Sequence, residues 1–223
     1  MPYHVHEIYP SKQGEGMHSG TPCVFCRFRG CNLWSGVEKD RQRAICRWCD
    51  TQFVGAYGPR GGTFASSESL ARTLLDCWHH HPYRPQTAHT PNARPFIILT
   101  GGEPSLQLDA ALIHSLHKHH CHIAIETNGT RPITLPIDWI CVSPKAHTTI
   151  AQKKGHELKV VMPQHTITRH TLSMMAQWDF QHFFIQPLDA PAQTRHIAHA
   201  MALCATQPPW RLSVQSHKWQ HIP

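Results

Sequence analysis

The chain has 223 residues, 40% of them hydrophobic, with nine cysteines, 21 histidines and a formal net charge of +7. A chain of this length buries roughly 70% of its unfolded surface and folds without bridges or metal, which excludes a disulfide-stapled miniprotein and a disordered chain. The length is that of about one domain, and we predict a single domain over residues 1–223.

The first predicted elements are a strand and a helix. The apolar run Val24–Phe28 predicts the strand that starts the barrel described below. Apolar residues at helical spacing follow over Leu70–Trp78, behind Ser66 or Ser67, either of which is a suitable N-cap. The proline-rich interval Pro82–Pro95 predicts a loop.

From residue 95 onward, short apolar runs alternate with amphipathic or polar stretches, and Leu108–Leu116 shows helical spacing. Alternating strands and helices predict a mostly parallel sheet. The stretch 131–138 is too short for a crossover helix, and a complete eight-unit barrel needs about 250 residues, so we predict an α/β fold with an incomplete, open TIM-like β/α barrel. The six strands are predicted around Phe96–Leu99, His122–Ile125, Trp139–Val142, Leu158–Val161, Phe183–Ile185 and Leu212–Val214.

The cysteine count and the amino terminus favour a reducing compartment. The number of cysteines is odd, and the first residues, MPYHVHEIYP, contain no apolar signal region. Thiols in such a chain act as ligands or reagents and seldom form bridges. No apolar run approaches the ~20 residues of a membrane span. We therefore expect a cytoplasmic, soluble protein with no membrane partner.

A basic balance is typical of nucleic-acid-binding proteins, but here the basic residues are scattered. The densest group is interrupted by acidic residues, and we interpret it as a solvated loop. The histidine runs 79–81 and 119–120 end predicted helices, where the helix dipole favours a partly charged imidazole, and we interpret them as surface residues. We expect no direct contact with nucleic acid. The basic group comprises Lys39, Arg41, Arg43 and Arg47.

Five cysteines near the amino terminus fit two different metal sites. Cys23 and Cys26 with Cys46 and Cys49 have the Cys-x2-Cys-x19-Cys-x2-Cys spacing of a structural zinc ribbon. Cys31 with Cys46 and Cys49 instead offers three thiolates to a cubane iron-sulfur cluster and leaves one iron without a protein ligand. Such an open iron binds a substrate or cofactor directly. The spacing alone leaves both interpretations open.

Polar and glycine-rich segments follow the predicted strands at one end of the sheet, where the active sites of β/α barrels lie. Each segment alone is an ordinary strand-end turn. Their recurrence along the chain favours an active site, and a zinc ribbon predicts none of them. The segments are Thr100–Pro104, Glu126–Gly129, Ser143–Lys145, Gln186–Asp189 and Gln215–Lys218.

Together these features resemble the radical S-adenosylmethionine superfamily. The three-cysteine spacing, TGGEP, ETNGT and SPK carry the resemblance, and KQGEG, CNLWSG and WCDT narrow it to the 7-carboxy-7-deazaguanine synthase family over residues 13–223. The 14-residue gap after Cys31 departs from the commonest Cys-x3-Cys-x2-Cys spacing and is characteristic of one branch of this family. Lys12 before QGEG and Ser216 in QSHK are mild departures that concern only substrate packing.

The resemblance implies a lyase that converts 6-carboxy-5,6,7,8-tetrahydropterin to 7-carboxy-7-deazaguanine with loss of ammonia, a step toward queuosine in tRNA. It implies a 4Fe-4S cluster, S-adenosylmethionine and Mg²⁺. The cluster would cleave S-adenosylmethionine to a 5'-deoxyadenosyl radical that takes a hydrogen from the pterin. The protein would bind and orient the cofactor and substrate and exclude competing reactions. An external electron donor of flavodoxin or ferredoxin type and a homodimer are also implied.

The resemblance assigns residues to each ligand and assigns none a catalytic role, because the radical forms on the cofactor. Cys31, Cys46 and Cys49, in a loop over residues 31–51, would bind the cluster, and Thr51 would bind magnesium. The S-adenosylmethionine-binding set is Trp48, Cys49, Asp50, Gly102, Ser143, Pro144, Lys145, Gln186, Pro187, Leu188 and Asp189. The substrate-binding set is Lys12, Gln13, Gly14, Glu15, Arg27, Thr100, His217 and Pro223. Glu103, Glu126 and Asn128 are expected as further contacts beside the S-adenosylmethionine-binding set.

Two of these assignments carry a physical reason, and a third, which rests on the resemblance alone, has a direct consequence. A β-carbon at Gly102 would block the approach of the methionine moiety. Arg27 supplies the fork-shaped donor that a substrate carboxylate favours. The terminal carboxylate of Pro223 is expected to bond the pterin, so that a carboxyl-terminal tag would not be tolerated.

Two other functions remain as alternatives. A glycyl-radical activase shares the cluster and GGEP but has the Cys-x3-Cys-x2-Cys spacing and lacks QGEG. A zinc-ribbon nucleic-acid-binding module would show clustered basic and aromatic residues, which this sequence lacks. Of the other cysteines, Cys77 and Cys141 are expected in the core, and Cys23 and Cys26 are assigned no metal role.

Overall fold

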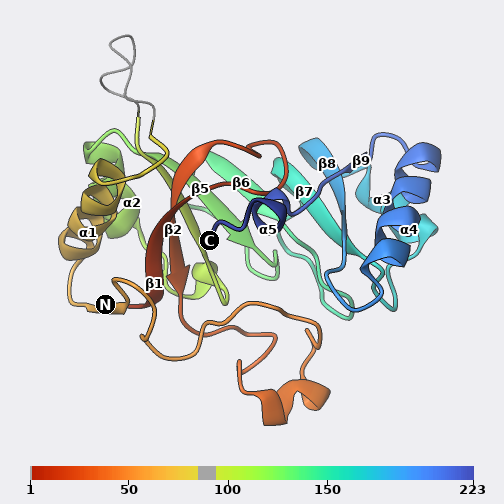
Figure 1. Ribbon diagram of the computed structural model, residues 1–223, viewed down its shortest axis with the longest axis horizontal. Helices are drawn as coiled ribbons and strands as arrows, with labels where there is room; N and C mark the ends of the chain where they lie inside the picture. Colours follow the sequence, from red (N-terminus) through yellow and green to blue (C-terminus); the bar gives the residue numbers. More distant parts are fainter. Residues whose placement is uncertain (1, 85–93) are drawn as a thin grey trace.

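A nine-stranded sheet runs through the computed structural model, which describes residues 2–84 and 94–223 (Figure 1). The strand order is β3-β1-β2-β4-β5-β6-β7-β8-β9, and β2 and β4 to β9 run parallel, while β1 is antiparallel to both of its neighbours. The edge strands are β3 and β9, so the sheet is open. The strands are β1 (Tyr3–Lys12), β2 (Pro22–Phe28), β3 (Gly62–Phe64), β4 (Phe96–Gly101), β5 (His122–Thr127), β6 (Trp139–Val142), β7 (Lys154–Met162), β8 (Asp179–Pro187) and β9 (Arg211–Leu212).

Six of the seven predicted strands lie in β2 and β4 to β8, because strands buried on both faces read as continuous apolar runs. The seventh, predicted over Leu212–Val214, overlaps the two-residue strand β9 only at Leu212. Val24–Phe28, predicted to start the barrel, lies in the first of the parallel strands, but β1 precedes it in the chain and pairs antiparallel with it. β1 buries Tyr3, Val5 and Ile8 but carries polar residues between them, so it shows no apolar run.

Helices α1 and α2 pack against the β1–β5 part of the sheet, and α4 packs against β7 to β9 at its other side (Figure 1). Ser66 caps α1 by accepting a hydrogen bond from the Ser69 amide at 3.2 Å, as predicted, and Asp109 caps α2. The stretch 131–138 contains no helix, also as predicted, and most of the predicted loop Pro82–Pro95 lies outside the described residues. The helices are α1 (Ser67–His79), α2 (Ala110–Lys118), α3 (Arg169–Met175), α4 (Gln193–Thr206) and α5 (Ser216–Gln220), with the 3-10 turns η1 (Glu38–Arg43) and η2 (Pro104–Leu106).

One histidine of the runs that we expected at the surface lies in the core. His81 is buried, and its Nε2 donates to the carbonyl oxygens of Ser11 at 2.9 Å and Cys23 at 3.0 Å. The Nδ1 atom accepts from the Tyr83 amide, which fixes this tautomer. His81 therefore ties the end of α1 to β1 and β2.

The connection between β2 and β3 extends beyond the sheet and contains η1; Figure 1 shows it in orange. It holds Cys31, Cys46 and Cys49, and we call residues 31–51 the cluster loop. Among the described residues, no helix is long and apolar enough to cross a membrane.

Candidate active site

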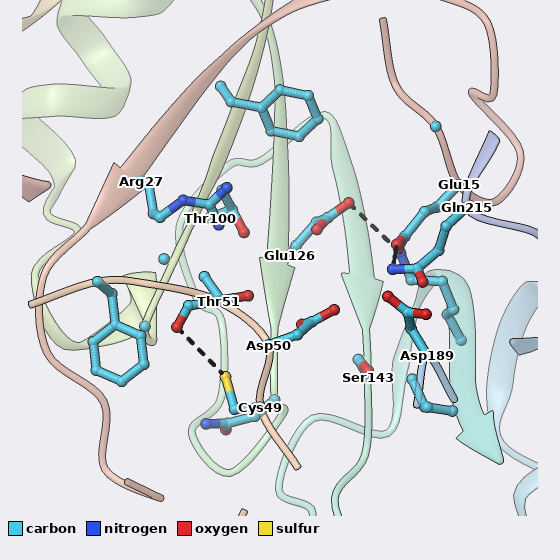
Figure 2. A pocket seen from close by; sticks show the side chains of 18 of the residues that line it. Glu15, Arg27, Cys49, Asp50, Thr51, Thr100, Glu126, Ser143, Asp189 and Gln215 are labelled. Atoms are coloured by element: carbon cyan, nitrogen blue, oxygen red, sulfur yellow. Dashed lines mark hydrogen bonds and ion pairs between the residues drawn. The ribbon is translucent and has the colours of Figure 1, made fainter. Parts of the chain in front are cut away.

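A cavity of about 440 Å³ lies where the carboxyl ends of the parallel strands meet the cluster loop and the carboxyl-terminal segment. Figure 2 shows Cys49 and Thr51 on one side of this cavity, with Glu15 and Gln215 across from them. Every residue that the sequence assigned to a ligand lines it except Pro144 and Glu103. That proline is buried, and its carbonyl accepts from the Gln164 side chain at 3.2 Å, so it supports the loop from behind.

The three thiols of the cluster loop lie on one wall of the cavity. The neighbouring Cys46 thiol lowers the pKa of the Cys49 thiol to about 6, which favours the thiolate that metals bind. Cys31 Sγ accepts from the Leu33 amide at 3.4 Å. In the described part of the chain, no three His, Cys, Asp or Glu side chains are close enough to hold a single ion. A cubane is bound through three separate irons and takes thiolates further apart, so this donor set fits it.

The zinc-ribbon interpretation is wrong because of the direction of two side chains. Cys23 and Cys26 are fully buried in β2 and belong to hydrophobic clusters on opposite faces of the sheet. Burial raises the pKa of both thiols well above the usual range. Neither can join Cys46 and Cys49 around a metal without unfolding the strand.

Arg41 corrects our interpretation of the basic group as a purely solvated loop. Its guanidinium lies 4.1 Å from the centre of the Trp34 ring and pairs with Glu38 at 2.8 Å. Its Nη1 donates to the carbonyl oxygens of Arg47 and Cys49, both at 3.0 Å. Arg41 therefore fixes the backbone that carries the second and third thiols.

The GGEP turn of β4 packs against the start of the cluster loop. A β-carbon at Gly102 would lie 1.9 Å from the carbonyl oxygen of Gly30, and the Glu103 amide donates to that oxygen at 2.8 Å. This close approach of two backbones is a second reason for glycine at position 102, besides the predicted approach of a methionine moiety. It also places Cys31 directly beside the turn.

Glu103 does not line the cavity, although we expected it to contact a ligand. Its carboxylate is fully buried and accepts from Thr127 Oγ1 at 2.7 Å and from the Asn128 amide at 2.8 Å. It joins the turns after β4 and β5. Glu126 and Asn128, the other two expected contacts, do line the cavity.

Arg27 is held by two side chains of β1. Its Nε donates to Glu7 Oε1 at 2.7 Å, and its Nη2 donates to the Tyr9 hydroxyl at 2.8 Å. All three residues line the cavity. Sequence reasoning missed Glu7 and Tyr9 because β1 was not predicted, although they alternate along it as residues on one face do.

A buried ion-pair network forms the opposite wall. Lys159 on β7 is 4% exposed, pairs with Glu15 and lies 3.7 Å from Glu126. The amides of Gln186 and Gln215 donate to Glu15 Oε1 at 3.0 and 2.9 Å. We did not predict Lys159, although a lysine inside an apolar strand is a recognisable signal because lysine is almost never buried unpaired.

The carboxyl-terminal segment docks on the QGEG turn. The amide and hydroxyl of Ser216 donate to the Gly14 carbonyl at 2.9 and 3.1 Å. A β-carbon at Gly14 would lie 2.0 Å from the His217 ring, so glycine admits the imidazole here. Ser11 Oγ donates to the Pro223 carbonyl oxygen. These contacts place His217 and Pro223 on the cavity wall.

Two lysines organise the loops that we assigned to S-adenosylmethionine. Lys218 on α5 pairs with Asp189 and lies 3.1 Å from Asp50, so it joins the loop after β8 to the cluster loop. Lys145 donates to Ser143 Oγ at 2.6 Å. Lys218 ends a segment that we expected at the active site, but its two partners could not be predicted because they are distant in sequence.

Acid is expected to destabilise the wild-type chain more steeply than a Glu15→Gln variant. Burial alone would raise the pKa of the Glu15 carboxyl, but the Lys159 ammonium lowers it from 4.5 to about 2. The resulting stabilisation is complete above the unfolded value of 4.5 and is lost as the pH falls from there toward about 2. Urea unfolding across this window measures the two slopes, and equal slopes would contradict the ion pair.

Comparison with known proteins identifies similar chains along the whole length. Curated proteins named 7-carboxy-7-deazaguanine synthase are 46% identical over 223 residues in Bordetella pertussis and 47% identical over 223 residues in Burkholderia multivorans, with 100% of each chain covered. That of Bradyrhizobium diazoefficiens is 47% identical over 218 residues, 98% of both chains. The crystal structure of QueE from Escherichia coli matches with a TM-score of 0.70 at 23% identity, over 97% of this chain and 95% of that one, which confirms the predicted fold. No protein-family model matches the chain.

Proposed function

The chain belongs to the 7-carboxy-7-deazaguanine synthase family, and we propose that the cavity binds S-adenosylmethionine and the pterin substrate side by side. It is a radical S-adenosylmethionine lyase that converts 6-carboxy-5,6,7,8-tetrahydropterin to 7-carboxy-7-deazaguanine with loss of ammonia, toward queuosine. The main support for the proposal is that three thiols and the ion-pair network of Glu15 and Glu126 around the buried Lys159 line the same cavity.

The thiol wall is the cofactor side of the proposal. When bound, the 4Fe-4S cluster and S-adenosylmethionine supply the radical that starts the reaction. Cys31, Cys46 and Cys49 would hold the cluster as thiolates. The turn at Gly102 would border the methionine moiety, whose ammonium and carboxylate match the mixed charges of the surrounding loops. These loops comprise Trp48–Asp50, Ser143–Lys145 and Gln186–Asp189.

The wall opposite the thiols is the substrate side. A carboxypterin presents an amide edge and an anion. Gln13 and Glu126 offer hydrogen-bonding groups for the edge, and Arg27, held by its two partners on β1, offers its remaining N–H groups to the carboxylate. The Thr51 hydroxyl between these groups and the thiols would bind Mg²⁺, which normally takes few protein ligands and keeps several waters.

The function is tested by anaerobic reconstitution with iron and sulfide, followed by addition of S-adenosylmethionine, dithionite and the carboxytetrahydropterin. We expect 7-carboxy-7-deazaguanine, ammonia and 5'-deoxyadenosine by mass spectrometry. A protein that holds its cluster and binds S-adenosylmethionine but leaves this pterin unchanged would overturn the proposal.

We propose that the external electron donor docks on the outside of the cluster loop. Buried Cys46 lies between Ile45, which is 46% exposed, and the exposed Arg47. Lys39 and Arg43 on η1 are also exposed, and neither pairs with a carboxylate in the described part of the chain. A basic surface with an apolar centre complements a small acidic flavodoxin or ferredoxin, and it lies beside a thiol that would touch the cluster.

Charge reversal distinguishes an effect on donor docking from an effect on catalysis. Lys39→Glu/Arg43→Glu is expected to lower flavodoxin-driven turnover about 10-fold and to weaken the salt dependence of flavodoxin binding. Turnover with dithionite should not change, because neither side chain reaches the cavity. Arg72→Glu/Lys118→Glu, an exposed pair on α1 and α2, is the matched control. Equal losses with both reductants would contradict the docking surface.

The homodimer and the single domain remain predictions with direct tests. Sedimentation velocity measures the oligomeric state, and a monomer at micromolar concentration would contradict the homodimer. One cooperative unfolding transition, detected by both tryptophan fluorescence and circular dichroism, is expected for a single domain over residues 1–223.

A further inference from the structure

Lys159 is a buried cation whose role the family assignment leaves open. Its side chain is 4% exposed and contacts carboxylates from two separate elements, the QGEG turn and the end of β5. Burying an ammonium is costly unless it is paired. Although burial opposes its charge, Glu126 and Glu15 raise the pKa of Lys159 well above the usual value. It therefore stays charged inside the substrate wall.

The Glu15 carboxylate is occupied by the protein. Its Oε1 accepts from Gln186 and Gln215, and its Oε2 accepts from Lys159. Gln186 is oriented in turn, because its Oε1 accepts from Ser213 Oγ at 3.1 Å. A carboxylate has about four acceptor positions. Glu15 has three of them filled, so it offers a ligand little beyond its charge.

The Glu126 carboxylate is only half occupied. Its Oε1 accepts from Gln13 Nε2 at 2.8 Å and lies 3.7 Å from Lys159 Nζ. Its Oε2 receives no hydrogen bond from residues 2–84 or 94–223. The side chain is 25% exposed and lines the cavity. A carboxylate with one free oxygen is an acceptor for the N–H groups of a ligand.

We propose that Lys159 is a positioning residue that acts through Glu126, by locking Glu15 into the protein and holding Glu126 with one free oxygen toward the cavity. The free oxygen accepts N–H groups from the amino-amide edge of the substrate heterocycle. The identity of that heterocycle rests on the proposed function. Lys159 would thus determine which of two neighbouring carboxylates binds the substrate.

The experiment is a double-mutant cycle between Lys159→Met and Glu126→Gln on the reconstituted enzyme. Lys159→Met is expected to raise the KM for the pterin ~10²-fold, the scale of removing one partner of a buried charge pair, with S-adenosylmethionine affinity unchanged. Because both changes remove the same interaction, the double variant should have a KM no higher than the weaker-binding single variant. Lys154→Met, an exposed lysine on the same strand, controls for charge.

Additive effects in the cycle, or an unchanged pterin KM in Lys159→Met, would overturn the proposal and leave Lys159 as a structural ion. If Lys159→Met alone does not fold, the double variant is compared with Glu126→Gln instead. The double variant loses one positive and one negative charge, so the network keeps its wild-type net charge. A further rise in KM in that comparison would also overturn it. A wild-type enzyme that does not convert the pterin would instead contradict the proposed function.

Discussion

Replacing Cys31 with alanine is expected to abolish cluster assembly and product formation, whereas Cys23→Ala should retain both. Cys31 borders the cavity with the other two loop thiols, and a cubane held by only two thiolates has two irons without a protein ligand. Cys23 is 0% exposed within β2 and faces Phe25 and Ile98. Its replacement removes one buried sulfur and should cost about 1–3 kcal/mol of stability.

The Cys31→Ala and Cys23→Ala variants are compared by their iron and sulfide content and by their visible absorption after reconstitution. Cys26→Ala, on the opposite face of the same strand, is a second control and should behave like Cys23→Ala. A protein that loses its metal in Cys23→Ala and retains it in Cys31→Ala would contradict the assignment. A colourless wild-type protein that contains zinc would contradict the cluster itself.

The strands could be predicted because their local sequence already reflects their burial. Phe96–Leu99 and Trp139–Val142 are apolar without interruption and lie in β4 and β6, which are central to the sheet. β1 lies near an edge and carries His4, Glu7 and Tyr9 among its buried residues, so its pattern does not stand out from a loop. Its antiparallel pairing with β2 is a long-range property that no local pattern contains.

The location of the site could be predicted for a topological reason, but the direction of single side chains could not. Parallel strands place their carboxyl ends together, so motifs that follow the strands must converge. Within those motifs, Glu103 turns into the protein and Glu126 turns into the cavity, although both follow an apolar run. Lys159 and Glu15 are 144 residues apart, and only the folded chain brings them together.

Gly102→Ala is expected to lower turnover about 10²-fold, the scale of a misplacement of about 1 Å at a reacting site. The new β-carbon would lie 1.9 Å from the carbonyl oxygen of Gly30, and backbone cannot move aside as a flexible side chain does. Either the GGEP turn or the residues before Cys31 must shift. The shift would also break the hydrogen bond from the Glu103 amide to Gly30.

This effect differs from that of a glycine needed only for the approach of S-adenosylmethionine. If only the ligand required Gly102, the variant would be as stable as the wild type until the ligand is added. Because the clash is with Gly30, we expect the free energy of unfolding to fall by about 1–3 kcal/mol without any ligand. Gly62→Ala on β3, where no heavy atom lies within 4 Å of the new carbon, is the matched control and should change neither quantity. Wild-type stability with reduced turnover in Gly102→Ala would assign the glycine to the ligand alone, and wild-type values of both would show that the backbone there moves freely.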